Sequence, residues 1–452
     1  MGLCTLISFF LSTFFLQTLS SLDFPIGSQV SLPIPSIYQP GFKGRAYVLD
    51  SSSNSSKFRV ALNVEAISGR YFCSLIVLFD DFKVWASDHV VKFIPASKCV
   101  LELTHDGNLQ LMDQFGFIGW QSGTSYRGVK MLHLEEHIGN LVLIDEANQI
   151  IWQCFSHPTD TILWGQQLKA PLPLTVFPTN SSVFYSFEII QEKVVAYIYW
   201  RKNKYSYWQL KPHGNRTIEF MRLGTRGLKI FNQDSHKIAQ ILSDGTDPIQ
   251  LFTMGIDGNL GFYHYSLKLG RVKPSYKLLG SCDLPLACGL YGICSPQNTC
   301  RYLQTGSIRD EINDRFETGM YNGICELFGD EVEMVQLKGV ESILRSPYFI
   351  LNISEESCVN SCMENCSCDS VVYSDQEKRC FQFGLVAGAR EVYGENGQSF
   401  WVKMPKEKRD GTSNDTVKKF VAIGGRSNIC KQASLLNRSS DWYSTILNPV
   451  PG

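Results

Sequence analysis

The sequence predicts a mainly β protein built as a three-sided β-prism, a second β-rich domain, a small disulfide-rich module and a cysteine-rich α+β module. Three observations predict this order. A tryptophan-bearing repeat fills the first third of the chain, short alternating runs rich in Tyr, Phe and Trp fill the next, and two cysteine clusters follow. Alternation with a period of two is typical of strands that have one buried face.

The repeat occupies residues 99–166 and contains two full copies, at 101–122 and 132–154. Each copy is an alternating run, a Gly-Asn-Leu turn, a second alternating run and a strand that ends in Trp-Gln. Gly and Asn tolerate positive φ, so they favour tight turns between antiparallel strands. The tryptophans are Trp85, Trp120 and Trp152, with spacings of 35 and 32 residues.

A single sheet of this kind has one apolar face and needs partners to bury it. Three such sheets can pack around a common axis, with one large flat indole from each filling the centre. The repeat therefore predicts a β-prism in which the three tryptophans meet.

The first 21 residues predict a secretory signal peptide. They contain an apolar run from Leu6 to Leu16 followed by small polar residues, without Lys or Arg ahead of the run. A membrane anchor is the alternative, but the run is shorter than the ~20 residues that a span needs. The formal net charge of −1 gives no indication of nucleic-acid binding.

Export agrees with the cysteine count and with the glycosylation sequons. Of 15 cysteines, removal of Cys4 with the signal leaves 14, an even number that fits a disulfide framework. Asn-x-Ser/Thr sequons predict glycosylated surface loops at Asn54, Asn180, Asn215, Asn352, Asn365, Asn414 and Asn437.

The repeat closes with Trp152-Gln-Cys-Phe-Ser-His-Pro-Thr-Asp-Thr-Ile-Leu-Trp-Gly-Gln166. This run resembles the close of the plant bulb-type (G-type) mannose-lectin domain of S-locus glycoproteins and their receptor-like relatives. The resemblance implies a lectin domain over residues 22–168. Cys154 stands where that family usually has Ser.

Residues 169–278 predict a second β-rich domain. Asp257-Gly-Asn-Leu260 repeats the turn of the first domain within a series of alternating runs. Two interpretations are open: a diverged copy of the prism, or the S-locus-glycoprotein-like segment of the same family.

Residues 279–303 contain four cysteines at nearly equal steps, Cys282, Cys288, Cys294 and Cys300. Zinc sites usually show tight Cys-x-x-Cys pairs, and an exported chain favours disulfides. The run resembles the shortened EGF-like module of the same family, so we expect two disulfides and no metal.

Residues 320–405 resemble the PAN/apple module of plant S-receptor-like proteins through the run Cys358-x3-Cys362-x3-Cys366-x-Cys368. The resemblance implies pairs between Cys358 and Cys380 and between Cys362 and Cys368. Cys325 and Cys366 remain for each other or for Cys430. Cys73 is expected to pair with Cys99, and Cys154 with Cys430 or with no partner.

Residues 406–452 predict a polar, disordered tail. Relatives with this architecture often continue into a transmembrane helix and a kinase, and neither pattern occurs in this sequence. Membrane attachment is therefore expected only in a longer isoform.

A bulb-lectin mannose site resembles Gln-x-Asp-x-Asn-x-Val-x-Tyr on one strand, whose alternate residues face the same way. Parts of this pattern recur in three places, so the sequence predicts side chains that bind sugar weakly. The alternative is that the asparagines only form turns. The predicted ligands are Asp106, Asn108, Asn140, Val142, Asp257, Asn259 and Tyr263.

One run, His133-Leu-Glu-Glu-His137, matches an inverted zinc-peptidase motif. That motif needs a helix, and here it lies between β-patterned runs, where the two histidines would be ~13 Å apart. We therefore expect no enzyme, no metal and no cofactor.

These observations predict a secreted or cell-surface, non-catalytic binding protein assembled like a receptor ectodomain. The first hypothesis is recognition of mannose-type glycans or glycoproteins. The second is a protein-interaction ectodomain with degenerate sugar sites that acts as a partner or decoy of receptor-like kinases.

Overall fold

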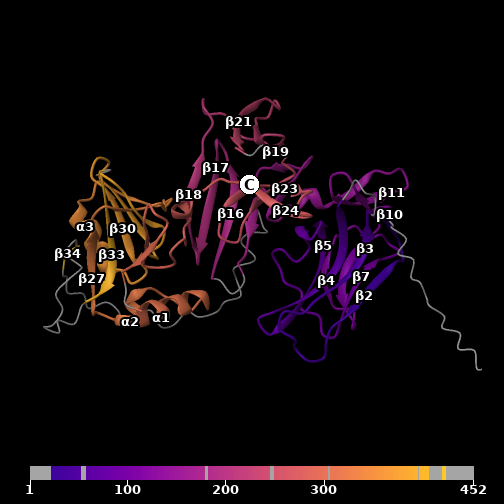
Figure 1. Ribbon diagram of the computed structural model, residues 1–452, viewed down its shortest axis with the longest axis horizontal. Helices are drawn as coiled ribbons and strands as arrows, with labels where there is room; N and C mark the ends of the chain where they lie inside the picture. Colours follow the sequence, from indigo (N-terminus) through magenta and orange to yellow (C-terminus); the bar gives the residue numbers. More distant parts are fainter. Residues whose placement is uncertain are drawn as a thin grey trace, which may run out of the picture.

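The computed structural model describes residues 22–51, 57–178, 182–244, 249–303, 306–394, 397–406 and 420–423. These residues form three bodies in a row (Figure 1). The N-terminal strands, drawn in indigo and purple, make one end, the magenta strands lie in the middle, and the orange cysteine-rich part makes the other end.

The first body is the predicted β-prism, made of three antiparallel four-stranded sheets. Each sheet combines one early strand with three consecutive later strands. The sheets are β1 (Asp23–Pro25), β10 (Val129–Glu135), β11 (Asn140–Asp145) and β12 (Ile150–Gln153); β2 (Gln29–Pro33), β7 (Lys98–Leu103), β8 (Leu109–Asp113) and β9 (Ile118–Gln121); and β3 (Lys43–Asp50), β4 (Phe58–Ile67), β5 (Arg70–Phe79) and β6 (Phe82–Ala86).

The three tryptophans meet on the axis, as predicted. The ring centroids of Trp85, Trp120 and Trp152 are 5.9–6.2 Å apart, and every pair is edge-to-face. This geometry is the favourable one for aromatic rings. The Trp85 indole N–H also donates to the backbone carbonyl of His157 at 2.8 Å.

A second prism with the same strand order follows, which favours the interpretation of this region as a diverged copy. A short 3-10 helix, η1 (Cys154–Ser156), precedes it. Its sheets are β13 (Thr161–Leu163), β22 (Leu251–Met254), β23 (Leu260–Ser266) and β24 (Arg271–Lys277); β14 (Gln167–Lys169), β19 (Phe220–Gly224), β20 (Gly227–Phe231) and β21 (Lys237–Leu242); and β15 (Leu174–Val176), β16 (Val183–Ile190), β17 (Lys193–Trp200) and β18 (Asn203–Leu210). Because β13 and β14 already belong to these sheets, the second prism begins before the expected boundary at residue 169.

All six sheets carry an irregularity at the same place, directly after one cross-strand pair. In the first prism these pairs are Val77 with Trp85, Leu111 with Trp120, and Leu143 with Trp152. In the second they are Ala196 with Trp208, Ile230 with Ala239, and Phe262 with Tyr276. A bulge bends its strand and increases the local twist, so its recurrence gives six sheets the same curvature.

Aromatic side chains join the two prisms. Tyr263 and Tyr265 on β23 lie 5.7 Å from Phe82 and 6.2 Å from Phe79, between ring centroids. Leu163 and Leu251 of the second prism belong to the hydrophobic core of the first.

The four-cysteine segment is fastened to the C-terminal part. It contains η2 (Ser281–Asp283), β25 (Gly292–Cys294) and β26 (Cys300–Tyr302), with disulfides Cys282–Cys294 and Cys288–Cys300. Strand β25 pairs in parallel with β32 (Ala389–Glu391), which continues to β28 (Val340–Ser342).

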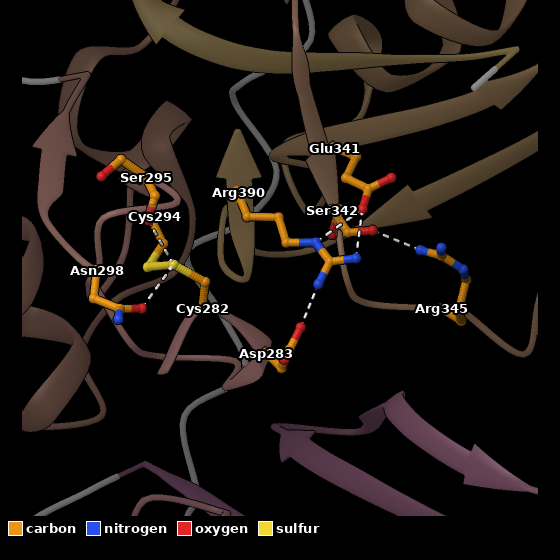
Figure 2. A network of polar contacts seen from close by, with 9 residues as sticks. All are labelled: Cys282, Asp283, Cys294, Ser295, Asn298, Glu341, Ser342, Arg345 and Arg390. Atoms are coloured by element: carbon orange, nitrogen blue, oxygen red, sulfur yellow. Dashed lines mark hydrogen bonds and ion pairs between the residues drawn. A yellow bond between two sulfur atoms is a disulfide. The ribbon is translucent and has the colours of Figure 1, made fainter. Parts of the chain in front are cut away.

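Figure 2 shows the polar network that accompanies this pairing. The Arg390 guanidinium contacts the carboxylates of Asp283 and Glu341, the latter at 2.7 Å. Arg345 donates to the Ser342 carbonyl at 2.6 Å, next to Glu341. One arginine thus connects the four-cysteine segment with two strands of the C-terminal part.

The C-terminal part is an α+β unit. Its helices are α1 (Gly306–Glu317), α2 (Ile324–Phe328) and α3 (Glu355–Glu364). Its six-stranded sheet contains β29 (Ile350–Leu351), β31 (Arg379–Phe383), β30 (Ser370–Ser374), β33 (Gln398–Pro405), β27 (Val332–Leu337) and β34 (Phe420–Ile423), in that spatial order.

Helix α3 begins at the cap residue Ser354, whose hydroxyl accepts the Ser357 N–H at 3.2 Å. It carries Cys358 and Cys362, which form disulfides with Cys380 and Cys368, the pairs that the resemblance implies. Residues 420–423 of the tail form β34, which pairs with β27. The rest of the tail, with Cys430, lies outside the described residues.

Cys73 and Cys99 form a disulfide that joins β5 to β7 in the first prism. Among the residues that the structure describes, no helix has both the length and the apolar character needed to cross a membrane.

Candidate functional site

The outer faces of the first-prism sheets are the candidate sugar-binding surfaces. The common bulge aligns their central strands, so that Ser74, Asn108 and Asn140 occupy one equivalent position. The next outward positions are Ile76, Gln110 and Val142, and then Leu78, Met112 and Ile144. In the bulb-lectin pattern, the position of Asn108 is Asn and the position of Gln110 is Val.

Asn108 is buried, and its carboxamide organises the turn that surrounds it. Its Oδ1 accepts the backbone N–H groups of Gly123 and Thr124 at 3.0 and 3.2 Å, together with the Ser122 hydroxyl. Its Nδ2 donates to Gln121 Oε1 at 3.0 Å. These contacts support the alternative interpretation of Asn108 as a turn residue.

Asn140 and Asn259 make the equivalent contacts. Asn140 Oδ1 accepts the Phe155 N–H at 3.3 Å, and its Nδ2 donates to Gln153 Oε1 at 2.9 Å. Asn259 Oδ1 accepts the Leu279 N–H at 3.1 Å. In all three cases the Asn Oδ1 accepts a backbone N–H just after the last strand of the sheet, which is β9, β12 or β24. This recurring Asn therefore stabilises the repeat.

Asp106 lies in the turn between two strands, since β7 ends at Leu103 and β8 begins at Leu109. Asp106 therefore does not lie on a strand, as the bulb-lectin pattern would require. Asp106 accepts the Thr104 hydroxyl, and this hydrogen bond lowers the pKa of the Asp106 carboxyl.

The predicted row in the second prism is also broken. Asp257 Oδ1 accepts the Asn259 N–H within their turn at 2.9 Å. Tyr263 packs against Phe82 in the contact between the prisms, so it faces the first prism instead of a ligand. The pattern of alternate residues could not reveal this, because it holds no information on domain packing.

The outer face of β7, β8 and β9 keeps polar side chains. Gln110 Nε2 donates to Glu102 Oε2 at 3.1 Å, and both side chains are half-buried beside Met112. A carboxylate and an amide offer several acceptors and donors, which suit sugar hydroxyls. Glu102 was not predicted as a ligand, although its alternation with Leu101 and Leu103 places it on the outer face.

The other two faces differ from this one. On β10–β12, His133 contacts Asp23 at 2.6 Å and Glu135 accepts from Asn140 at 2.6 Å, but the position of Gln110 is occupied by Val142, which is buried. On β4–β6 the outward Ala61, Ile76, Leu78 and Ala86 form a small apolar cluster. The face that contains Glu102 and Gln110 is the one best suited to polar ligands.

Cys154 replaces a serine within the repeat. Its sulfur accepts the Leu141 N–H at 3.2 Å, as the Ser122 hydroxyl accepts the Leu109 N–H at 3.0 Å. Burial raises the pKa of the Cys154 thiol to about 12. Cys154 thus takes the structural place of Ser122 in the repeat, and it forms no disulfide within the described residues.

The zinc-peptidase pattern adopts the predicted non-helical conformation. His133 lies on β10 and His137 in the turn that follows it. No group of three or more metal-ligating side chains occurs in the described ranges.

The glycosylation sequons are partly placed. Asn215, Asn352 and Asn365 are exposed, as glycan acceptors must be. Asn54, Asn180, Asn414 and Asn437 lie outside the described residues.

Comparison with known proteins agrees with the prism. Residues 83–173 match the family described as D-mannose binding lectin. The chain is 24% identical over 402 residues to the G-type lectin S-receptor-like serine/threonine-protein kinase SD2-5 of Arabidopsis thaliana, covering 83% of this chain and 48% of that protein. A second G-type lectin S-receptor-like serine/threonine-protein kinase of Arabidopsis thaliana is 23% identical, over 65% of this chain and 36% of its own length.

Among solved structures, a monomeric monocot mannose-binding lectin from Gastrodia elata is 25% identical over 29% of this chain and 94% of its own, with a TM-score of 0.20. The chain spans less than half the length of the two kinases. In these comparisons residues 83–173 match the D-mannose binding lectin family, and the chain is similar, over most of its own length, to plant G-type lectin S-receptor-like kinases.

Proposed function

We propose that this protein is a secreted or cell-surface, non-catalytic receptor-ectodomain-like protein that binds mannose-type glycans. The match of residues 83–173 to the D-mannose binding lectin family carries the proposal. The disulfides Cys73–Cys99 and Cys358–Cys380 support an oxidising, extracellular location.

The proposed ligand surface is the outer face of β7, β8 and β9. The Glu102 carboxylate and the Gln110 amide supply acceptors and donors to sugar hydroxyls, and the Met112 side chain packs against ring carbons. Because only part of the bulb-lectin pattern is present, we expect this site to bind its glycan weakly.

A glycan array with competition by free mannose tests this function. We expect retention of oligomannose glycans, at least tenfold weaker binding by Gln110→Ala, and unchanged binding by Gln209→Ala, which removes an exposed amide from β18 of the second prism. A correctly folded protein that retains no glycan would contradict the proposal.

The C-terminal modules also belong to the proposal. The crossed disulfides of residues 279–303 support an EGF-like module, and helix α3 with its two disulfides against a sheet supports a PAN/apple module at 320–405. For the remaining cysteines, we expect disulfide mapping to join Cys325 to Cys366. The buried Lys403 ammonium contacts Cys325 Sγ at 3.7 Å and, at 2.9 Å, the carbonyl of Asn365, the residue that precedes Cys366.

A second function has one observation in its favour. Residues Tyr348, Phe349, Ile350 and Leu351 are all exposed, and β29 is an edge strand. Exposed apolar edges are typical of protein-interaction sites. A protein that bound a receptor-like kinase ectodomain while retaining no glycan would establish this alternative, as a partner or decoy.

A further inference from the structure

We infer a second saccharide-binding site, in the cleft between the two prisms. This inference rests on the proposed glycan-binding function and deepens it. The cleft has a volume of about 360 Å³ and lies away from the outer face of β7–β9. Its size is within the range of ~300–1,000 Å³ that is typical of small-molecule sites, which occur preferentially at domain interfaces.

The aromatic wall of the cleft is formed by Trp164 and Phe58. Trp164 follows β13 in the second prism and is 44% exposed, although it is one of the largest apolar side chains of the molecule. Phe58, at the start of β4, comes from the first prism and is nearly buried. An exposed indole within a concavity offers a flat apolar surface to the C–H face of a pyranose ring.

The backbone holds Trp164 in place without its side chain. The Trp164 N–H donates to the Gln250 carbonyl at 3.3 Å, and Gln250 Oε1 accepts the Tyr265 N–H at 2.5 Å. Gly165, at φ +88°, lies beside Ile138 of the first prism. The backbone at Trp164 is therefore anchored where the prisms touch, and it presents the partly exposed indole to the cleft.

Polar groups from both prisms surround this aromatic wall. Glu136 and His137 come from the turn after β10, with His137 Nε2 and Glu136 Oε1 3.8 Å apart, and the His137 side chain is 79% exposed. Thr225 comes from the turn between β19 and β20. Lys57 lies at the rim, its ammonium 5.6 Å from the centroid of the Tyr265 ring.

This combination favours a saccharide over an apolar ligand. The residues that line the cleft include a carboxylate, an imidazole, a hydroxyl and an ammonium, and groups of these kinds can hydrogen-bond to several sugar hydroxyls. An apolar ligand could not use the hydrogen-bonding capacity of these groups.

Titration of the full chain with mannotriose, followed by calorimetry and tryptophan fluorescence, tests the inference. We expect two binding events. Trp164→Ala should abolish one of them or weaken it at least tenfold, and Trp164→Phe, which keeps an aromatic face, should weaken it less than Trp164→Ala. Tyr393→Ala, at an aromatic residue that is 88% exposed outside the cleft, should change nothing.

The companion variant Gln110→Ala separates this inference from the proposed function. A single event that Gln110→Ala removes and Trp164→Ala leaves intact would overturn the cleft site and keep the lectin function. No binding of mannotriose by the wild-type chain would overturn both. Thermal unfolding of each variant confirms that any loss comes from a folded protein.

Discussion

The two prisms have the same strand order and the same bulges, but their axes are filled differently. The first prism places Trp85, Trp120 and Trp152 in the cross-strand pair next to the bulge, whereas the second places Trp208, Ala239 and Tyr276 there. A small residue at one of these positions does not change the topology. Strand order and bulges therefore depend on the apolar pattern and the turns, not on the indoles.

The cores explain why the first prism needs three indoles. The core of the first prism is nearly closed within its own strands, with only a few side chains from the second. The core of the second runs on into the C-terminal part, where Trp200 packs on Phe316 and Tyr205 on Phe383. A prism that shares its core with neighbouring modules obtains buried area from them, so it can tolerate a less well-filled axis.

The largest expected effect comes from the axis of the first prism. Trp85→Ala removes a nearly buried indole and its hydrogen bond, and should lower the free energy of unfolding by about 3–5 kcal/mol. Trp208→Ala, at the equivalent but half-buried position of the second prism, should cost less. Urea unfolding of both variants measures the difference, and equal losses would contradict the contrast between the two axes.

The next effect uses pH to separate the cores. Burial raises the pKa of the Asp369 carboxyl in the C-terminal part to about 6, above its usual 3.8. A carboxyl with a raised pKa binds its proton more tightly when folded, so stability should fall as pH rises from about 4 to about 6, by about 3 kcal/mol at most. The unfolding transition of the second prism and C-terminal part should show this fall, and that of the first prism should not.

Asp369→Asn provides the control for the pH effect. The side-chain oxygen of Asn can still accept the Ile324 N–H, which donates to Asp369 at 3.1 Å, but the side chain no longer titrates. The pH dependence between 4 and 6 should therefore weaken in the variant. An unchanged profile would assign the effect to another group.

A smaller effect should be alike in the two prisms. Asn108→Ala removes the acceptor of the Gly123 and Thr124 N–H groups, and Asn259→Ala removes that of the Leu279 N–H, so each should cost about 1–3 kcal/mol. Chemical denaturation compares the two variants. A large loss of glycan binding by Asn108→Ala at full stability would instead make Asn108 a sugar ligand.

The smallest effect concerns Cys154. Since Ser122 occupies the equivalent position and accepts the equivalent N–H, Cys154→Ser should change the free energy of unfolding by less than about 1 kcal/mol. In the wild-type protein, the thiol should react with a thiol reagent only after denaturation, because burial raises its pKa to about 12. Rapid reaction of the folded protein would show that residue 154 is accessible.

Several features could be predicted from the sequence because they are local. The period of the Trp repeat and the Gly-Asn turns predicted the first prism, and the resemblance implied the cysteine pairs of α3. Helix α1 was missed, although Ile308, Ile312 and Phe316 recur at the four-residue spacing of a buried helix face.

The candidate site was less predictable because it depends on contacts distant in sequence. The alternating pattern predicted that Asp106 lies on a strand, whereas in the structure Asp106 lies in the turn between β7 and β8. Tyr263 fits the bulb-lectin pattern, but it packs on Phe82, 181 residues earlier in the chain. The cleft at Trp164 exists only where two prisms meet, so no single motif encodes it.

The central functional claim is that glycans bind the outer face of β7–β9, and Met112 on β8 provides a direct probe. In a methyl-labelled protein, titration with mannotriose should shift the NMR signal of the Met112 methyl group in a saturable manner. The signals of Met254 and Met334, buried in the second prism and the C-terminal part, should not move. A Met112 signal that stays unchanged while the sugar binds would contradict the account.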